Sequence, residues 1–415
     1  MGGREVEKIF ICLIYEEGVI MAKIYCYILT LLFILTFSAQ SEAKEVKPLF
    51  GLSKFVSNEA DDYLLQRWTE INMSDEAAKM YPKLYKTLSS YSKSLKNNAM
   101  ERQRKYHEES LSLSQESGET RQFYDKSDII VRRADSVVLS LIENGEDYMG
   151  GVHGMYGYFG TNIDVETGKY LHISDVCTNA EDLLKAIMTR LHEDAPRSPF
   201  EGAEEKIMKS IVEDNLNFTI DPAGISVYFN PYEIGSYAEG LFTATLLFSE
   251  YPNLFKDKYK QLPPAYCETL TLYYPNIVSF KNGMRNYVQI NLEDNGNYNV
   301  GCGGGIAEDE TGLRGLEPPV LVHMANGKNY LYIDGYIEGV GRRLHVYNIS
   351  DNNLELVWVL PCTFKDMNGL KKYETWWVPT DPNRVQFYSS EPIEAGGTPM
   401  NHIGSINFDG SFNFG

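Results

Sequence analysis

The residues best suited to chemistry lie in a glycine-rich segment at residues 150–159, which reads GGVHGMYGYF. In an enzyme, His153 would serve as a general base, because proton transfer needs a group that titrates near neutrality within hydrogen-bond reach. Possible partners follow in the sequence at Asp164, Glu166 and His172. The segment therefore allows a secreted hydrolase that uses His153 with Asp164.

A structural interpretation of His153 is simpler, and we favour it. Glycines on both sides of the histidine permit positive φ and close approach of strands, and a half-buried imidazole can bond to the backbone there. The sequence contains no G-x-S-x-G nucleophile elbow. We expect no catalytic residue, and we place His153 among residues that shape a sheet and bind a ligand.

The sequence gives no pattern typical of a metal or phosphate site. A metal at His153 and His172 would need Asp164 as a third ligand, and this spacing matches no known signature. The glycines of residues 301–312, GCGGGIAEDETG, run into acidic side chains that repel anions, which predicts a surface loop. No carboxylate pair is singled out for glycoside hydrolysis. We expect neither a metal nor a cofactor.

Tyrosines form the other candidate site, in the segment SVYFNPYEIGSYAEG. Tyr228, Tyr232 and Tyr237 surround a proline-containing bend there. Tyrosine offers an apolar ring with a polar end, which suits contacts with proteins and sugars. We predict that these three residues bind a ligand together with His153, and the alternative that two of them cap the sheet core stays open.

The elements that must position these residues indicate an α+β fold. Apolar residues at helical spacing, among them Leu84 and Leu88, predict a helix from about Ser74 to Ser117, within a helical segment at 44–120. The later part of this helix is polar, and we expect it to be solvated or frayed.

A period of two then predicts strands between Asp128 and Val176, the last of them at 169–177. Two helices follow, the first with Asn179 as its N-cap, and then three more strands with a turn at 221–224. Residues 121–255 therefore form a mixed helix and antiparallel-sheet domain.

The C-terminal part of the chain shows no helical spacing of apolar residues. Residues 256–269 read as a proline-containing linker, and residues 270–415 contain short alternating runs separated by turn residues. The pattern predicts a separate all-β module, and a sandwich, a barrel and propeller-like blades all remain open.

The N-terminal residues are typical of a leader. Lys23 precedes an apolar run from Ile24 to Phe37 and a small-residue exit at Ala43, as in a cleaved secretory signal. The codons of residues 16–18 could form a ribosome-binding sequence ahead of Met21, so we expect translation to begin at Met21 and residues 1–20 to be a misassigned start. We therefore expect a secreted or periplasmic protein.

Charge and cysteines limit the class of protein. The chain carries a net charge of −19, and a leader of residues 1–43 contains three basic and five acidic residues, which leaves −17 on the remaining 372. An acidic surface disfavours nucleic acid and anionic membranes and attracts a cationic partner. Four cysteines remain after the leader, and Cys302 with Cys362 is the disulfide to test first. They are Cys177, Cys267, Cys302 and Cys362.

Four motifs resemble a known bacterial extracytoplasmic domain. It occurs in lysozyme-sensing anti-sigma factors of the RsiV type and in the non-catalytic part of peptidoglycan deacetylases of the PdaC type. Residues 75–251 carry the resemblance, and its motifs are Tyr-Pro-x-Leu at 81–84, Gly-Gly-x-His-x at 150–154, Asn-x-Asp-x-x-Thr-Gly-Lys at 162–169 and Tyr-Glu-Ile-x-x-Tyr-Ala-x-Gly at 232–240.

The resemblance implies a binding or sensing module outside the cytoplasm. At most 23 residues precede the apolar run, and no Asp-Asp-Gly-Pro-like motif occurs, so neither sigma-factor control nor deacetylation is carried over. We expect a non-enzymatic cell-envelope protein that recognises a lysozyme-like cationic protein or a cell-wall glycan. The alternatives are the hydrolase built on His153 and a protein whose functional part is the C-terminal β module.

Overall fold

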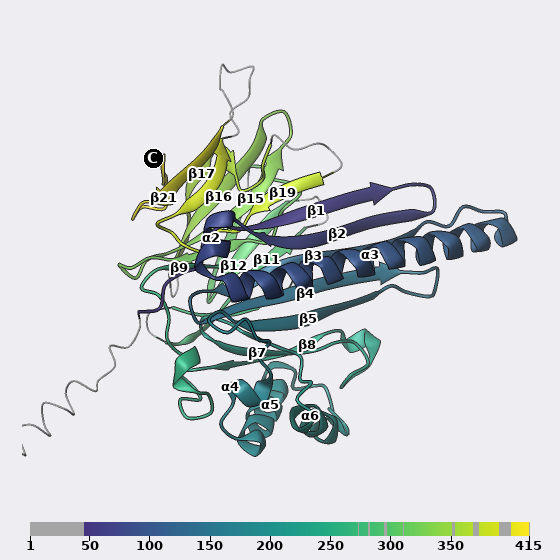
Figure 1. The fold of residues 1–415 in the computed structure, drawn as a ribbon, viewed down its shortest axis with the longest axis horizontal. Coiled ribbons are helices and arrows are strands. Elements are labelled where there is room, and N and C mark those ends of the chain that lie inside the picture. Colours follow the sequence, from purple (N-terminus) through teal and green to yellow (C-terminus); the bar gives the residue numbers. More distant parts are fainter. Residues whose placement is uncertain are drawn as a thin grey trace, which may run out of the picture. The chain divides into compact units, whose positions relative to one another are not determined.

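A computed structural model describes residues 45–415 apart from 273, 281–282, 294–296, 310, 351–352, 368–372, 390–399 and 415. Residues Val46–Gly415 form one compact unit (Figure 1). The predicted leader lies outside the described residues, so the signal peptide and the start at Met21 stay predictions. Within the described part of the chain, no helix combines the length and apolar character that a membrane span requires.

A six-stranded mixed sheet forms the scaffold, in the order β19-β1-β2-β3-β4-β5. Its neighbours are antiparallel except for β2 and β3, which run parallel. The outermost strand β19 comes from the C-terminal region. The strands are β1 (Leu52–Ala60), β2 (Leu64–Met73), β3 (Phe123–Ala134), β4 (Val138–Tyr148), β5 (Met155–Asp164) and β19 (Tyr373–Trp377).

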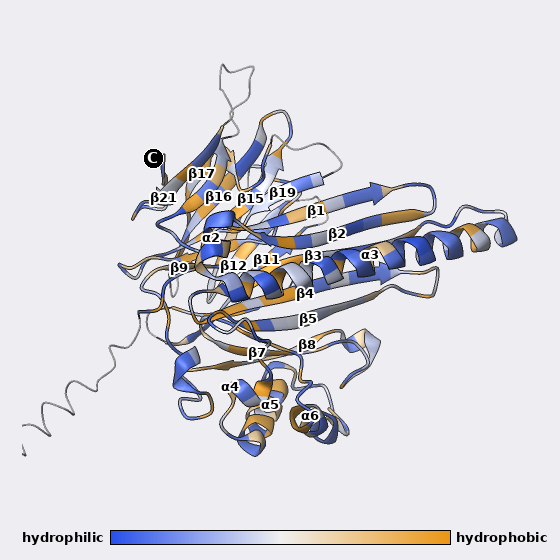
Figure 2. Ribbon diagram, in the orientation of Figure 1, coloured by the Kyte–Doolittle hydropathy of each residue, from blue (hydrophilic) through white to orange (hydrophobic). Residues whose placement is uncertain are grey.

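The predicted N-terminal helix is confirmed as two helices, α2 (Asp75–Met80) and α3 (Pro82–Ser117), which adjoin the sheet (Figure 1). Pro82 begins α3 because the first turn of a helix needs no backbone N–H donor. Leu84 and Leu88 are fully buried, as the apolar stripe predicted. The second half of α3 is mostly hydrophilic (Figure 2), and the helix ends at Gly118 in the left-handed conformation.

The residues before α2 differ from the predicted helical segment at 44–120, because they form strands β1 and β2. These strands bury polar side chains at Ser57, Gln66 and Thr69. Thr69 Oγ1 donates to the Ser127 carbonyl oxygen, and Gln66 Nε2 donates to the Asp125 carboxylate, both on β3. Buried polar residues interrupt the apolar alternation by which a strand is recognised.

A second layer contains helices and a three-stranded sheet in the order β6-β7-β8. Asn179 caps its longest helix as predicted, since its side chain accepts from the Asp182 N–H. Asp221 N–H donates to the Gly224 carbonyl in the predicted turn between β6 and β7. The elements are α4 (Ile173–Val176), α5 (Ala180–Asp194), α6 (Ala203–Val212), β6 (Phe218–Ile220), β7 (Gly224–Phe229) and β8 (Phe242–Leu247).

The strand predicted for residues 169–177 is wrong, because α4 replaces most of it. The Asp175 carboxylate accepts from the His172 N–H and closes the first turn of the helix. Ile173 and Val176 both face the core. A single helical turn and a short strand bury the same two residues, so the apolar pattern does not distinguish them.

Two asparagines of the second layer form hydrogen bonds with the backbone at the outer edge of β5. Asn230 accepts from the Tyr158 N–H and donates to the Tyr158 carbonyl, and Asn217 accepts from the Gly160 N–H. A Cβ on Gly157 would lie 2.8 Å from Asn230 Oδ1, so only glycine leaves room for this amide. The second layer therefore docks through side-chain amides instead of continuing the sheet.

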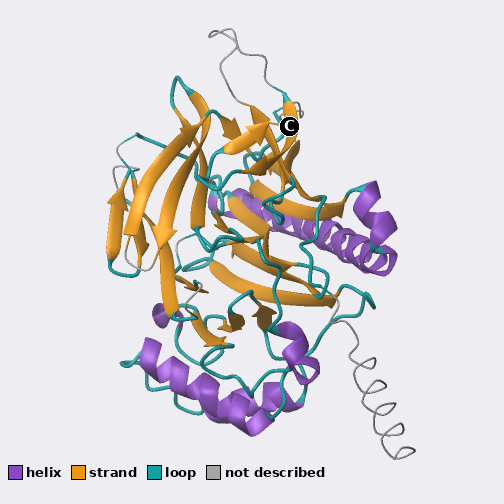
Figure 3. Cartoon of the chain, turned by 90° about the vertical axis from the view of Figure 1, so that its left-hand side faces the viewer, coloured by secondary structure: helices purple, strands orange, loops and turns teal. Residues whose placement is uncertain are grey.

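The C-terminal region is all-β as predicted and consists of stacked sheets (Figure 3). It also contributes β19 to the scaffold. Successive residues of β15 face opposite cores, with Tyr330 and Tyr332 on one side and Leu331 and Ile333 on the other. The orders are β17-β16-β15-β14-β9, β10-β11-β12-β13 and β18-β20-β21-β22.

The strands of this region are short except at its centre. They are β9 (Tyr266–Thr269), β10 (Asn276–Ser279), β11 (Arg285–Leu292), β12 (Tyr298–Cys302), β13 (Gly305–Glu308), β14 (Val320–His323), β15 (Asn329–Ile337), β16 (Gly341–Ser350), β17 (Asn353–Leu360), β18 (Cys362–Thr363), β20 (Val385–Ser389), β21 (Asn401–Ile406) and β22 (Phe412–Phe414).

Two expectations for this region are corrected. Cys362 carries a free thiol in one core, while Cys302 lies in another, so the Cys302–Cys362 disulfide is not formed. The glycines at 301–305 form part of a β-hairpin in which Cys302 pairs with Gly305, whereas a surface loop was predicted for 301–312. Asp309 is buried, with its carboxylate accepting from Thr311 and Leu313.

Two consecutive arginines on β3 join the parts of the chain. A break in the β3–β4 register between Val131 and Arg133 interrupts the alternation of side chains. Arg132 pairs with Asp221 of the β6–β7 turn at 3.1 Å and donates to the Thr269 carbonyl of β9. Arg133 pairs with Asp135 and donates to the carbonyls of Tyr259 and Gln261 in the connector. Both guanidinium groups are buried.

We expect Asp221→Ala to lower the free energy of unfolding by about 3–5 kcal/mol, because it leaves the buried Arg132 charge without its carboxylate. Denaturant unfolding measures the change. The matched control is Glu108→Ala, which removes the solvent-exposed pair with Arg104 and should have little effect. Equal stability of the two variants would contradict the assigned role of Arg132.

We expect the free energy of unfolding to fall as the pH drops below about 6.5. Burial lowers the pKa of His345, although Asp309 at 3.7 Å opposes the shift. The unfolded chain therefore binds more protons in this window, so stability rises with pH there. Urea titrations between pH 5 and 8 test this. His345→Gln should reduce the slope and His192→Gln, at an exposed position, should not; an unchanged slope in His345→Gln would refute the assignment.

Candidate functional site

His153 and two of the predicted tyrosines come together beside the β4–β5 loop. The His153 ring stacks on Tyr237 with ring centroids 3.6 Å apart, and its Nε2 lies 3.3 Å from the Tyr232 hydroxyl. His153 Nδ1 lies 2.9 Å from the Gly154 carbonyl oxygen, which places the ring hydrogen on Nδ1. The imidazole is exposed, whereas the sequence predicted a half-buried one.

Tyr237 is fixed by a backbone hydrogen bond, whereas Tyr232 is largely exposed. The Tyr237 hydroxyl donates to the Gly154 carbonyl at 2.7 Å, which ties the 230–240 segment to the β4–β5 loop. Tyr232 is 56% exposed and has a φ of +73°. A non-glycine residue in this conformation is strained and persists only where its surroundings enforce it. Tyr232 is thus presented to solvent at a local energetic cost.

Tyr228 is separated from this group. It is 4% exposed, its hydroxyl lies 2.9 Å from Thr219 Oγ1, and its ring packs edge-on against Tyr158. Tyr228 therefore fits the alternative in which a tyrosine caps the sheet core.

Further tyrosines extend the group over the face of the sheet opposite α3. Tyr124 of β3 stacks on Tyr148 of β4, and Tyr156 of β5 packs edge-on against Tyr237. A Cβ on Gly154 would lie 2.6 Å from the Tyr124 hydroxyl, so this glycine permits the close contact. We call this group the tyrosine surface. It consists of Tyr124, Tyr148, Tyr156, Tyr232, Tyr237 and Tyr274, with His153.

Charged groups border the tyrosine surface. The Lys126 ammonium lies 4.7 Å from the centre of the Tyr124 ring. Burial and then the Glu146 carboxylate raise the pKa of Tyr124, and burial together with Tyr156 raises the pKa of Tyr274 to about 12. These phenols are therefore neutral near neutral pH and act as hydrogen-bond donors.

The sequence reasoning missed Tyr124, Tyr148, Tyr156 and Tyr274. Tyr124 and Tyr148 face each other because β3 and β4 pair in that register. Tyr274 arrives from the C-terminal region, and its ring packs edge-on against Tyr158. The alternation of Tyr156 and Tyr158 on β5 was the one local signal that could have extended the predicted site.

The proposed pairing of His153 with Asp164 is not formed, because the two residues lie at opposite ends of β5. Nine strand residues, 155–163, lie between them and span about 30 Å. Asp164 forms an ion pair with Lys258 and accepts from Thr167. Although burial opposes ionisation, these hydrogen bonds lower the pKa of Asp164. Asp164 therefore stabilises the turn after β5.

His172 is also distant from His153. His172 stands at the start of α4, and its Nδ1 lies 3.0 Å from the Asp214 carbonyl oxygen. Glu166 is exposed in the turn after β5. In the described ranges, no group of three or more histidine, cysteine or acidic side chains is placed to hold a metal ion. The residues considered for a metal site thus serve separate structural contacts.

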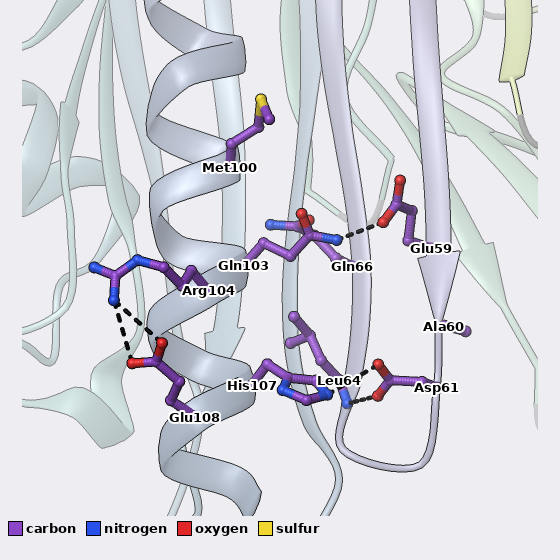
Figure 4. Close-up of a pocket in the computed structure, with 10 residues that line it drawn as sticks. All are labelled: Glu59, Ala60, Asp61, Leu64, Gln66, Met100, Gln103, Arg104, His107 and Glu108. Atoms are coloured by element: carbon purple, nitrogen blue, oxygen red, sulfur yellow. Dashed lines mark hydrogen bonds and ion pairs between the residues drawn. The ribbon is translucent and has the colours of Figure 1, made fainter.

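A polar cavity of about 330 Å³ lies between the β1–β2 hairpin and α3 (Figure 4). His107 Nε2 of α3 lies 3.2 Å from Asp61 Oδ2 at the hairpin tip, and Gln103 donates to Glu59. The Asp61 carboxylate also accepts from the Tyr63 and Leu64 N–H groups. These contacts attach the hairpin to the polar half of α3, which the sequence predicted to be solvated.

The comparison with protein families concerns the second layer. A family model described as "Protein of unknown function (DUF3298)" matches residues 173–249. No curated protein matches the chain. Two solved structures of DUF3298 family members are similar to it, from Bacteroides fragilis NCTC 9343 and Pseudomonas aeruginosa PAO1. Their identities are 18% and 14% and their TM-scores 0.36 and 0.33, and each comparison covers 52% of this chain and 96% of the other. Residues 173–249, from α4 to the end of β8, thus form a DUF3298 domain.

Proposed function

We propose that this chain is an exported, non-enzymatic binding or sensing protein of the cell envelope, whose tyrosine surface captures a cationic protein of the lysozyme type. The observation that carries the proposal is the meeting of Tyr232, Tyr237 and His153 at an exposed edge. The leader expected from the sequence and the resemblance to lysozyme-sensing domains support the location and the partner.

The chemistry of the tyrosine surface favours a protein partner. Tyrosine and methionine are enriched in the centres of protein interfaces, and the rigid tyrosine ring buries a large area at a low entropic cost. Apolar side chains surround the exposed edge, and Val152 at the loop tip is fully accessible to solvent. The others are Met149 and Met155, which are 37% and 40% exposed.

The electrostatics favour a cationic partner. The chain carries a net charge of −19, and the exposed Glu146 lies beside Tyr124. An acidic field attracts a cationic protein during encounter and repels anionic competitors. Tyrosine ring faces also accept lysine and arginine side chains through cation–π contacts.

A cell-wall glycan is the second candidate, because the parallel rings of His153 and Tyr237 at the surface could stack on a sugar ring. The phenols and the Glu146 carboxylate would hydrogen-bond to its hydroxyl groups. The hydrolase alternative is not favoured, since His153 and Asp164 lie at opposite ends of β5.

We expect Tyr237→Ala to weaken binding to lysozyme by about tenfold or more, as for a central interface residue. The dissociation constant is measured by calorimetry or surface plasmon resonance. Tyr85→Ala is the matched control, because Tyr85 is 45% exposed on α3, away from the tyrosine surface.

The same variants are tested for retention on purified peptidoglycan. Loss of lysozyme binding alone supports the protein partner, and loss of peptidoglycan retention alone supports the glycan. If the wild-type chain is retained by neither at low salt, the proposed function is wrong.

We expect lysozyme binding to weaken steadily as ionic strength rises from about 0.02 to 0.3 M, because salt screens exposed charges. The association rate should account for most of the loss. Glu146→Gln should reduce this salt dependence, and Glu116→Gln on the far half of α3 should reduce it less. Affinity that does not change with salt would exclude electrostatic capture.

A further inference from the structure

A second cavity, of about 360 Å³, lies at the junction of the DUF3298 domain with the C-terminal sheets. The β6–β7 turn contributes Pro222 and Ala223, and the end of β8 leads into Phe248. The opposite wall comes from β9 and β14. Most of the lining is apolar or aromatic, including Phe248, Leu262, Pro264, Tyr266, Phe280 and Met324.

His323 is a polar residue of this cavity whose ring is held in a fixed orientation. His323 lines the cavity while being only 8% exposed, and its ring stacks on Tyr266 with centroids 4.4 Å apart. Its Nε2 lies 3.0 Å from Oε1 of the buried Glu268. The stack and the carboxylate fix both the position and the rotation of the imidazole.

This arrangement determines the chemistry of the second ring nitrogen. A carboxylate only accepts hydrogen bonds, so Nε2 of His323 carries a ring hydrogen. In the tautomer with its single hydrogen on Nε2, Nδ1 carries a lone pair. Among the described residues, Nδ1 of His323 has no hydrogen-bond partner. The cavity therefore combines an apolar lining with a pre-oriented acceptor, which is the usual composition of a small-molecule site.

We propose that this cavity binds a small neutral molecule in which a compact aromatic ring carries a hydroxyl group, with that hydroxyl donating to His323 Nδ1. The ring would pack among Phe248, Phe280 and Met324. This site is independent of the tyrosine surface and goes beyond the proposed capture of a protein.

Three polar side chains around the cavity are already engaged within the chain, which favours a ligand with few polar atoms. The Lys260 ammonium is engaged by the Pro252 carbonyl and the Asp257 carboxylate. The hydroxyls of Ser249 and Ser279 donate to backbone carbonyls. The Glu268 carboxylate behind the imidazole disfavours an anion. A single donor on an otherwise apolar molecule fits these conditions.

The test uses two probes that differ by one hydroxyl, 4-methylphenol and toluene, with the whole mature chain. Binding is followed by NMR chemical-shift changes at residues that line the cavity. We expect 4-methylphenol to bind about tenfold more tightly than toluene, because one hydrogen bond distinguishes them.

His323→Phe keeps a ring for the stack on Tyr266 and removes the acceptor. In this variant the preference for 4-methylphenol should fall to about one, with toluene still bound. Ala325→Trp at the exposed rim should block both probes while leaving His323 in place, so it tests the cavity even where His323→Phe fails to fold. Ala238→Trp, at an exposed position of the 230–240 segment, is its matched control and should bind both probes normally.

Equal affinity for the two probes in the wild-type chain, or no binding of either, would overturn the proposal. An unchanged preference in His323→Phe, or normal binding in Ala325→Trp, would do the same. None of these outcomes bears on lysozyme binding, which is measured separately at the tyrosine surface.

Discussion

The buried pair of Arg132 with Asp221 is the interaction on which the arrangement of this chain depends. One guanidinium on β3 reaches the β6–β7 turn of the DUF3298 domain and the backbone of β9. Removing two charges from water is costly, and it is offset here by several hydrogen bonds in fixed directions. Such a pair adds geometric specificity more than net stability. The guanidinium keeps all of its hydrogen bonds only when β3, the β6–β7 turn and β9 are in this relative position.

The tyrosine surface depends on that placement. Tyr124, Tyr148 and Tyr156 belong to the six-stranded sheet. Tyr237 lies between β7 and β8 of the DUF3298 domain, and Tyr274 lies between β9 and β10. The asparagines that cover the edge of β5 set the distance between the first two groups. The surface is therefore composite, and each part alone would present only a fraction of it.

Much of the fold could be predicted from the sequence, because helices and hairpins are encoded locally. The stripe through Leu84 and Leu88, the cap at Asn179 and the turn at 221–224 all predicted the observed elements. Strands β1 and β2 were missed because Gln66 and Thr69 are buried polar residues whose partners lie on β3, beyond any local pattern. The candidate site was found in part: its 230–240 segment is contiguous, whereas Tyr124 and Tyr274 join it only through tertiary contacts.

Strand β19 has a consequence for how the chain is made. It pairs with β1, yet more than 300 residues separate Ser53 from its partner Trp377. During synthesis from the N-terminus, the outer edge of β1 has no strand partner until residues 373–377 have emerged. An open edge of this kind invites pairing with other chains. Strand β19 thus covers the outer edge of β1 within the same chain and prevents its pairing with other chains. A truncation that removes β19 would expose this edge.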